Sequence, residues 1–176
     1  MPESTRIPAE MDRAERPVVL VRASTGEGGP QPTRTAAGGA VVVALKLDGP
    51  CDDLLTFAFE SAAVRGLPLR VVHGRSLPVA AYVPWGVNHD MAEGIVQDAQ
   101  KPLSQTLRPW SDRFPQVDVT DSTPLVSPAK AVVRAAEGAD PLVVGRRRHH
   151  RAPAPHLGPQ AAIHHARCPV AVVPHD

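Results

Sequence analysis

Runs of aliphatic residues recur along the chain from residue 40 onward and alternate with stretches of helical periodicity. The longest run, AVVVALKL, begins at Ala40, and similar runs occupy residues 69–73, 142–144 and 170–173. Continuous apolar runs are typical of parallel strands that are buried on both faces. Residues 117–119 instead alternate apolar and charged side chains, which indicates a short strand near the edge of a sheet.

Two long helices are expected between these strands. Residues 52–65 carry apolar side chains at three- and four-residue spacing, begin with two aspartates that complement the helix dipole, and stop at Gly66. Residues 91–110 repeat an apolar side chain about every four positions, which predicts one buried helix face. Pro102 is expected to bend this second helix, because an interior proline removes a backbone hydrogen bond.

Two further helix starts complete an alternating pattern. A serine–proline pair at 127–128 and a glycine–proline pair at 158–159 both suit the cap and first position of a helix. Strands and helices then alternate throughout residues 40–176, which predicts an α/β fold with a doubly wound, Rossmann-like parallel sheet of five strands. Ligands of such sheets lie outside the carboxyl ends of the strands, so we expect the site in the loop that begins at Gly145.

The first 39 residues form an extension and a linker ahead of this domain. Within them, residues 18–21 are apolar, and the sequence RPVVLV is similar to CPVAVV near the end of the chain, which suggests an internal repeat. The alternative is a chance run of valines. We expect residues 18–21 to pair with residues 170–173 of the same or a second subunit, because a final strand leaves unpaired backbone groups at the sheet edge.

The composition favours a cytoplasmic protein. Lys and Arg number 19 against 18 Asp and Glu, a net charge of +1, so the overall balance favours neither nucleic acid nor membrane. No apolar run approaches the ~20 residues of a membrane span. The two cysteines form no Cys-x-x-Cys pair, as expected in a reducing compartment. Residues 74–88, rich in proline, glycine and aromatic residues, are a candidate lid or partner surface.

A basic run departs locally from this balance. Arg146, Arg147, Arg148 and Arg151, with two histidines between them, follow Gly145. Their guanidinium groups suit an anion, a phosphate ester or RNA, whereas the alternative is a solvated loop. No aromatic residues are interleaved for base stacking, so nucleic-acid binding is disfavoured.

Neither metal binding nor catalysis is predicted. The possible metal ligands match no zinc-site spacing; they are His149, His150, His156, His164, His165 and Cys168. The chain lacks a Gly-x-Ser-x-Gly motif, and neither cysteine has a definable partner histidine and acid. His73, at the end of the second strand, is expected to be a core histidine rather than a base.

The spacing of the loop resembles the ATP loop of universal stress proteins, Gly-x2-Gly-x9-Gly-(Ser/Thr). The stretch AVVVALKLDGPCDDLLTFAFESAAVRGLPLRVVHG is similar to the first strand, helix and second strand of that family, and the likeness covers residues 40–176. It implies strand order 3-2-1-4-5 and a homodimer formed through the C-terminal strand. It also implies a nucleotide site at Ala44, Lys46, Val72, Gly145, Arg148, Gly158 and Pro159.

Three of these positions depart from the family pattern. Lys46 stands where nucleotide-binding members keep an aspartate, Arg148 replaces the second glycine, and Pro159 replaces the hydroxyl residue. Arginine fills space that a polyphosphate needs, and proline offers neither an N–H nor a hydroxyl donor. We therefore expect a degenerate site and no bound cofactor, with ATP as the one candidate.

The expected function is non-catalytic regulation in a stress response, through dimerisation and contacts with unknown protein partners. Two alternatives stay open. One is an ATP- or AMP-binding stress sensor with weak ATPase activity, and the other is an anion- or RNA-binding module that uses residues 146–151. The likeness between residues 16–21 and 168–173 further suggests the second repeat of a tandem, actinobacterial-like member of the family.

Overall fold

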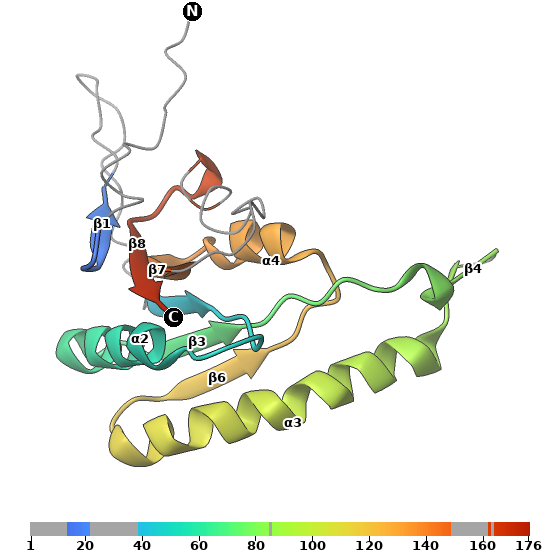
Figure 1. Cartoon of the computed structure of the whole chain (residues 1–176), viewed down its shortest axis with the longest axis horizontal. Helices are drawn as coiled ribbons and strands as arrows, with labels where there is room; N and C mark the ends of the chain where they lie inside the picture. The colour runs from blue at the N-terminus through green and yellow to red at the C-terminus, as the bar shows by residue number, and fades with distance from the viewer. Residues whose placement is uncertain (1–13, 22–38, 85, 149–161, 163) are drawn as a thin grey trace, which may run out of the picture.

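A six-stranded sheet runs through the centre of the molecule (Figure 1). The computed structural model describes residues 14–21, 39–84, 86–148, 162 and 164–176. All neighbouring strands are parallel except the first pair in the order given below. In spatial order the strands are β1 (Val18–Leu20), β8 (Val170–His175), β7 (Ala139–Arg147), β2 (Ala40–Ala44), β3 (Leu69–Val72) and β6 (Val119–Ser122).

The parallel part of the sheet confirms the predicted α/β fold. In chain order β2, β3, β6, β7 and β8 are the first to fifth strands, so their spatial arrangement is 3-2-1-4-5. β6 forms one edge, as the alternating pattern of residues 117–119 predicts, although the strand itself lies slightly later in the chain. β1 is antiparallel and extends the other edge, so the complete sheet is mixed.

Helices cover the sheet on both faces: α2 (Asp52–Arg65) and α3 (His89–Arg113) on one, and α4 (Pro128–Ala135) on the other (Figure 1). Successive residues of β2 enter different cores. Val41 and Val43 belong to the core beneath α2 and α3, whereas Val42 belongs to the core beneath α4. Because β2 is buried on both faces, its sequence is a continuous apolar run rather than an alternating one.

Helix α2 has the predicted bounds, and its buried side chains are the predicted ones. Gly66 ends it with a φ of 61°, a left-handed conformation that glycine adopts without strain. Phe59 of α2 packs against two rings of the α3 end, Trp110 at 6.1 Å and Phe114 at 5.6 Å between centroids. These aromatic contacts join α2 and α3 into one layer.

Helix α3 starts at a capping residue and continues past two prolines. The side-chain oxygen of Asn88 accepts a hydrogen bond from the Met91 N–H at 3.1 Å. Pro102 and Pro109 both lie inside the 25-residue helix. Met91, predicted to lie on the buried face of the helix, is exposed, because this end of α3 extends beyond the sheet (Figure 1). The predicted face is confirmed at Ala99, Leu103 and Leu107.

The predicted ends of two strands are wrong. β7 continues through Gly145 to Arg147, and β8 continues through Pro174 to His175. The two strands remain paired over these extra residues, so their mutual backbone contacts outweigh the local glycine and proline signals.

Residues 74–88 are also more ordered than a plain loop. They contain the 3-10 helix η1 (Val79–Ala81) and a small hairpin of β4 (Tyr82–Val83) and β5 (Gly86–Val87). Within the parts of the chain that the structure describes, no helix is both long and apolar enough to cross a membrane.

Candidate functional site

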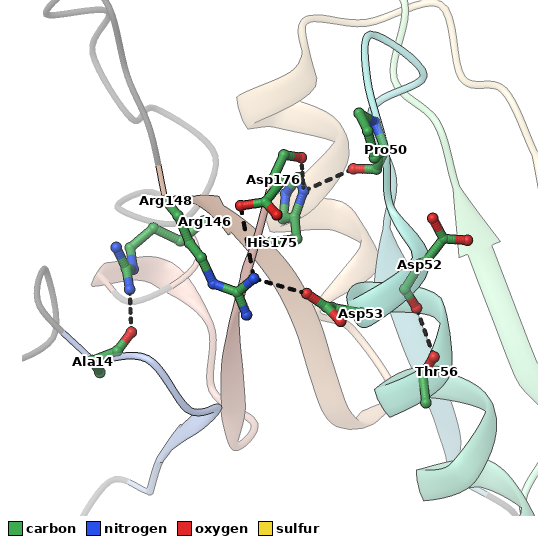
Figure 2. Close-up of polar contacts among 9 residues, drawn as sticks. All are labelled: Ala14, Pro50, Asp52, Asp53, Thr56, Arg146, Arg148, His175 and Asp176. Carbon is green, nitrogen blue, oxygen red and sulfur yellow. Dashed lines mark hydrogen bonds and ion pairs between the residues drawn. The ribbon is translucent and has the colours of Figure 1, made fainter.

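The candidate site lies at the carboxyl ends of β2, β7 and β8, next to the first turn of α2. This is the edge of an α/β sheet at which ligands bind. Figure 2 shows the polar side chains that gather there, with Arg148 directed toward Asp53 of α2 and toward the C-terminal Asp176. Arg146 is directed the opposite way, toward Ala14.

Gly145 has a packing role at this edge. A Cβ atom added to it would lie 2.5 Å from Nε2 of His175 and 3.1 Å from Cδ2 of Leu54. The imidazole of His175 is nearly buried, and its Nδ1 lies 3.0 Å from the carbonyl oxygens of Pro50 and Asp176. Two carbonyl acceptors require the proton on Nδ1. Gly145 therefore makes room for a fixed histidine ring of the protein itself.

Arg148 forms two ion pairs and a backbone hydrogen bond in the site. Its guanidinium lies 3.1 Å from Oδ2 of Asp53 and 3.7 Å from Oδ1 of Asp176, and its backbone N–H donates to the carbonyl of His175 at 2.8 Å. The side chain is 34% exposed, so each ion pair alone contributes little to stability. Their combined effect is positional, since they connect the end of β7 to both α2 and the end of β8.

Arg147 forms a further ion pair beside the two ion pairs of Arg148. Its guanidinium donates to Oδ1 of Asp48 at 2.5 Å. Asp48 lies in the turn that follows β2, where Gly49 leaves space for the arginine: a Cβ atom at Gly49 would be 3.2 Å from the Arg147 guanidinium. The predicted anion-binding arginines 147 and 148 are thus both engaged with carboxylates of the same chain.

Arg146 does not join this cluster, because it points to the face of β7 opposite to its neighbours Gly145 and Arg147. Arg148 follows the last residue of β7 and reaches Asp53 of α2 from there. It donates instead to the backbone carbonyl of Ala14, close to the start of β1 (Figure 2). The structure therefore separates Arg146 from Arg147 and Arg148. Arg151, the fourth predicted anion-binding residue, lies outside the described residues.

The predicted nucleotide-binding residues are brought to the same edge but not to the same face. Ala44 and Val72 are register partners on β2 and β3, and both pack toward the core beneath α4. Gly145 instead contacts Leu54 of α2 on the other face. Lys46 is exposed in the turn after β2. Gly158 and Pro159 lie outside the described residues, as do His149, His150 and His156.

The acidic half of the site is not predicted from the sequence. The sequence predicts only a helix-dipole role for Asp53 and no role for His175 or Asp176. The one signal in the sequence is the balance of charge: in a chain of net charge +1, acidic residues elsewhere must offset the basic run. His73 is the buried, sheet-end residue that was predicted, with Nδ1 at 2.9 Å from the carbonyl of Leu45.

Both cysteines have environments that disfavour the thiolate. Burial raises the pKa of the Cys51 thiol, and the negative charge of Asp52 raises it further. Burial likewise raises the pKa of Cys168. In the described parts of the chain, no three His, Cys, Asp or Glu residues are grouped so that they could hold a metal ion.

These raised pKa values predict slow thiol chemistry. In the folded protein, Cys51 and Cys168 are expected to react slowly with Ellman's reagent at about pH 8 and quickly after denaturation. The pKa of both thiols is near 9.0 in the unfolded chain and higher in the folded one. The free energy of unfolding is therefore unaffected well below pH 9 and decreases as the pH rises above 9, because the unfolded chain loses its thiol protons first. Melting temperatures between about pH 8 and 10 check this. Fast labelling of the native chain at neutral pH would contradict it.

The fold and the position of the site define a class, the α/β proteins that place a site at the carboxyl edge of a doubly wound sheet. The model of the universal stress protein family matches residues 39–174. The chain therefore belongs to the universal stress protein family.

Relatives and solved structures agree with this assignment. A universal stress protein of Mycobacterium tuberculosis is 31% identical over 134 residues, which are 74% of this chain but 44% of that protein, so the chain spans less than half of its length. A family structure from Burkholderia pseudomallei has a TM-score of 0.55 at 19% identity, over 77% of this chain and 96% of its own.

A longer universal stress protein from Archaeoglobus fulgidus aligns further. Its TM-score is 0.57 at 14% identity, over 94% of this chain and 52% of its own. A share of 94% means that the alignment extends to the N-terminal side of Ala40.

Proposed function

We propose that the protein is a non-catalytic regulator of the universal stress type, which acts in a stress response through self-association and contacts with other proteins and does not use a nucleotide. The ion pairs of Arg148 carry the proposal. They fix a long side chain at the position where the family loop has a glycine. A polyphosphate approaches backbone amides closely only where side chains are absent.

The charges of the site also oppose a polyphosphate. Asp48, Asp53 and Asp176 are the carboxylates paired with Arg147 and Arg148, and all three are exposed enough to act on a bound ligand. Two unit charges at 4 Å repel by about 1 to 4 kcal/mol in water or near a protein surface. An incoming phosphate must therefore compete with three carboxylates for two guanidinium groups.

The two alternatives receive less support. An ATP- or AMP-binding sensor with weak ATPase activity needs the ribose-binding aspartate that Lys46 replaces. An anion- or RNA-binding module needs arginines that can turn to a ligand, whereas Arg147 and Arg148 face carboxylates and Arg146 faces Ala14. His73 and His175, the buried histidines among the described residues, are held by backbone carbonyls rather than placed as bases.

The proposal places the protein in the cytoplasm and its self-association at the C-terminal strand, β8. It also treats the chain as the counterpart of one repeat in a tandem protein. Two observations support this. The chain matches only 44% of the length of the mycobacterial relative, and residues 16–21 are similar to residues 168–173. β1 then corresponds to the last strand of a preceding repeat.

A nucleotide titration tests the proposal. Ligand at 100 times its dissociation constant adds about 2.7 kcal/mol to stability, which would raise the melting temperature of a chain this size by roughly 5–10 °C. We expect no shift with Mg-ATP, ADP or AMP at millimolar concentration, no heat in calorimetry and no phosphate release. Micromolar binding or steady hydrolysis would contradict the proposal and favour the sensor.

A further inference from the structure

The N-terminal strand β1 lies along the outer edge of β8 in the same chain (Figure 1). The predicted pairing is therefore confirmed, and it is made within one subunit. β1 covers backbone groups that would otherwise be unpaired at the sheet edge. The residues that face one another are Val18 with Val172, Val19 with Ala171, and Leu20 with Val170.

This pairing has the symmetry of a strand paired with a copy of itself. Residues 17–20 read Pro-Val-Val-Leu and residues 169–172 read Pro-Val-Ala-Val, so Val19 and Ala171 are equivalent positions. Val19 and Ala171 form the central pair. In each outer pair, the first residue after the proline of one strand faces the third residue after the proline of the other. Two antiparallel β8 strands related by a twofold axis would pair in the same way, with Ala171 opposite Ala171. β1 thus imitates the β8 strand of a second copy in sequence, direction and register.

The side chains of β1 alternate between the core and the solvent, as those of a sheet strand do. Val18 and Leu20 are partly buried and pack against the core beneath α4. Val19 and Val21 point away and are 49% and 71% exposed. Arg146 holds the preceding segment by donating to the carbonyl of Ala14. The contact is short, three residue pairs, which suits a strand that can be exchanged.

β8 without β1 would be an open docking edge. All six residues of β8 are buried, and Val170 and Val172 belong to the core on which β1 packs. An apolar edge strand with unpaired backbone groups takes up another strand. A second copy of β8 fits this edge because the pattern of apolar side chains that β1 presents is the pattern of β8 itself.

We infer that β1 is an internal competitor of self-association: paired in cis it keeps the chain monomeric, and on release it exposes the β8 edge to the β8 edge of a second copy. The inference rests on the proposed function only in taking self-association as its output. Because β1 is tethered to the same chain, it competes at an effective concentration on the order of millimolar, so micromolar protein is expected to be monomeric while β1 is in place.

Two matched double variants of the full chain test the inference. Val18→Asp/Leu20→Asp puts two charges on the side of β1 that faces the core. Val19→Asp/Val21→Asp puts the same charges on the exposed side. By sedimentation at micromolar concentrations, the wild type and the outward variant are expected to be monomers, and the inward variant a dimer with a dissociation constant at least about tenfold lower. Equal masses for all three would overturn the inference.

A crosslink answers the same question if the inward variant fails to fold. Val19→Cys/Ala171→Cys, in a Cys168→Ser background, joins facing positions. The oxidised protein is expected to contain the disulfide within one chain and to stay monomeric at hundreds of micromolar, at which the reduced protein dimerises. A disulfide between two chains would show that β1 is exchanged, and identical association of both forms would show that another surface is used. Either result overturns the inference.

The nucleotide titration separates this inference from the proposed function. Wild type and inward variant are titrated with Mg-ATP in parallel. Binding without any effect of β1 on mass would contradict both proposals, whereas a β1-dependent mass change together with nucleotide binding would contradict the proposed function alone.

Discussion

Replacing Gly145 with alanine is expected to lower the free energy of unfolding by about 1–3 kcal/mol, the usual cost of inserting a methyl group into a packed site. The new Cβ would lie 2.5 Å from Nε2 and 2.8 Å from Cδ2 of His175, so the ring or the strand must move. The ring is held on its other side by Pro50 and Asp176, and Leu54 closes the remaining space. Urea unfolding of the wild type and Gly145→Ala measures the loss.

Gly94 supplies a matched control. It lies inside α3, and a Cβ atom added there would meet nothing within 4 Å. Gly94→Ala is therefore expected to raise stability, by up to about 1 kcal/mol, because alanine favours the helix. The same substitution is thus expected to change the free energy of unfolding in opposite directions at the two positions. A neutral Gly145→Ala would contradict the packing role of Gly145. The role would also be wrong if Gly145→Ala lowered stability as much in a His175→Ala protein as it does in the wild type.

The sheet was predictable because its signals are local. The runs that form β2 and β8 are apolar throughout, and burial on both faces is the physical reason. The ends of the strands were not predictable in the same way. β7 and β8 pass through Gly145 and Pro174 because each strand continues while its neighbour does. That pairing joins segments far apart in sequence, and the glycine and proline rules describe one segment at a time.

The candidate site was predictable in place but not in its contacts. Spacing in the loop located Gly145 and Arg148 at the carboxyl edge, and the fold places that edge as expected. Their roles depend on His175, Asp53 and Asp176, which reach the site only through the packing of α2 and β8. A sequence pattern cannot show which of the 18 acidic residues will meet a given arginine.

Reverting the three departures from the family loop is expected to restore little nucleotide affinity by itself. Lys46→Asp, Arg148→Gly and Pro159→Ser together return the residues that the family motif contains. Removing the Arg148 side chain, however, also removes the ion-pair partner of Asp53 and Asp176. Both carboxylates then lie beside the place that a phosphate must enter without the arginine charge that offsets them, and each repels a phosphate by about 1 to 4 kcal/mol at 4 Å.

Adding Asp53→Asn and Asp176→Asn to that triple variant is expected to tighten Mg-ATP binding at least about tenfold, which corresponds to 1.4 kcal/mol. The amides keep the size of the side chains and remove the charge, so the gain measures repulsion rather than space. Asp98→Asn/Asp112→Asn, both on exposed positions of α3, gives the same net charge and serves as the control in the same triple background. Calorimetry at low and high salt measures all three proteins, and the gain should shrink as salt screens the charges. Equal affinities for the two five-residue variants would show that these carboxylates do not exclude phosphate, and that the site is closed by its shape alone.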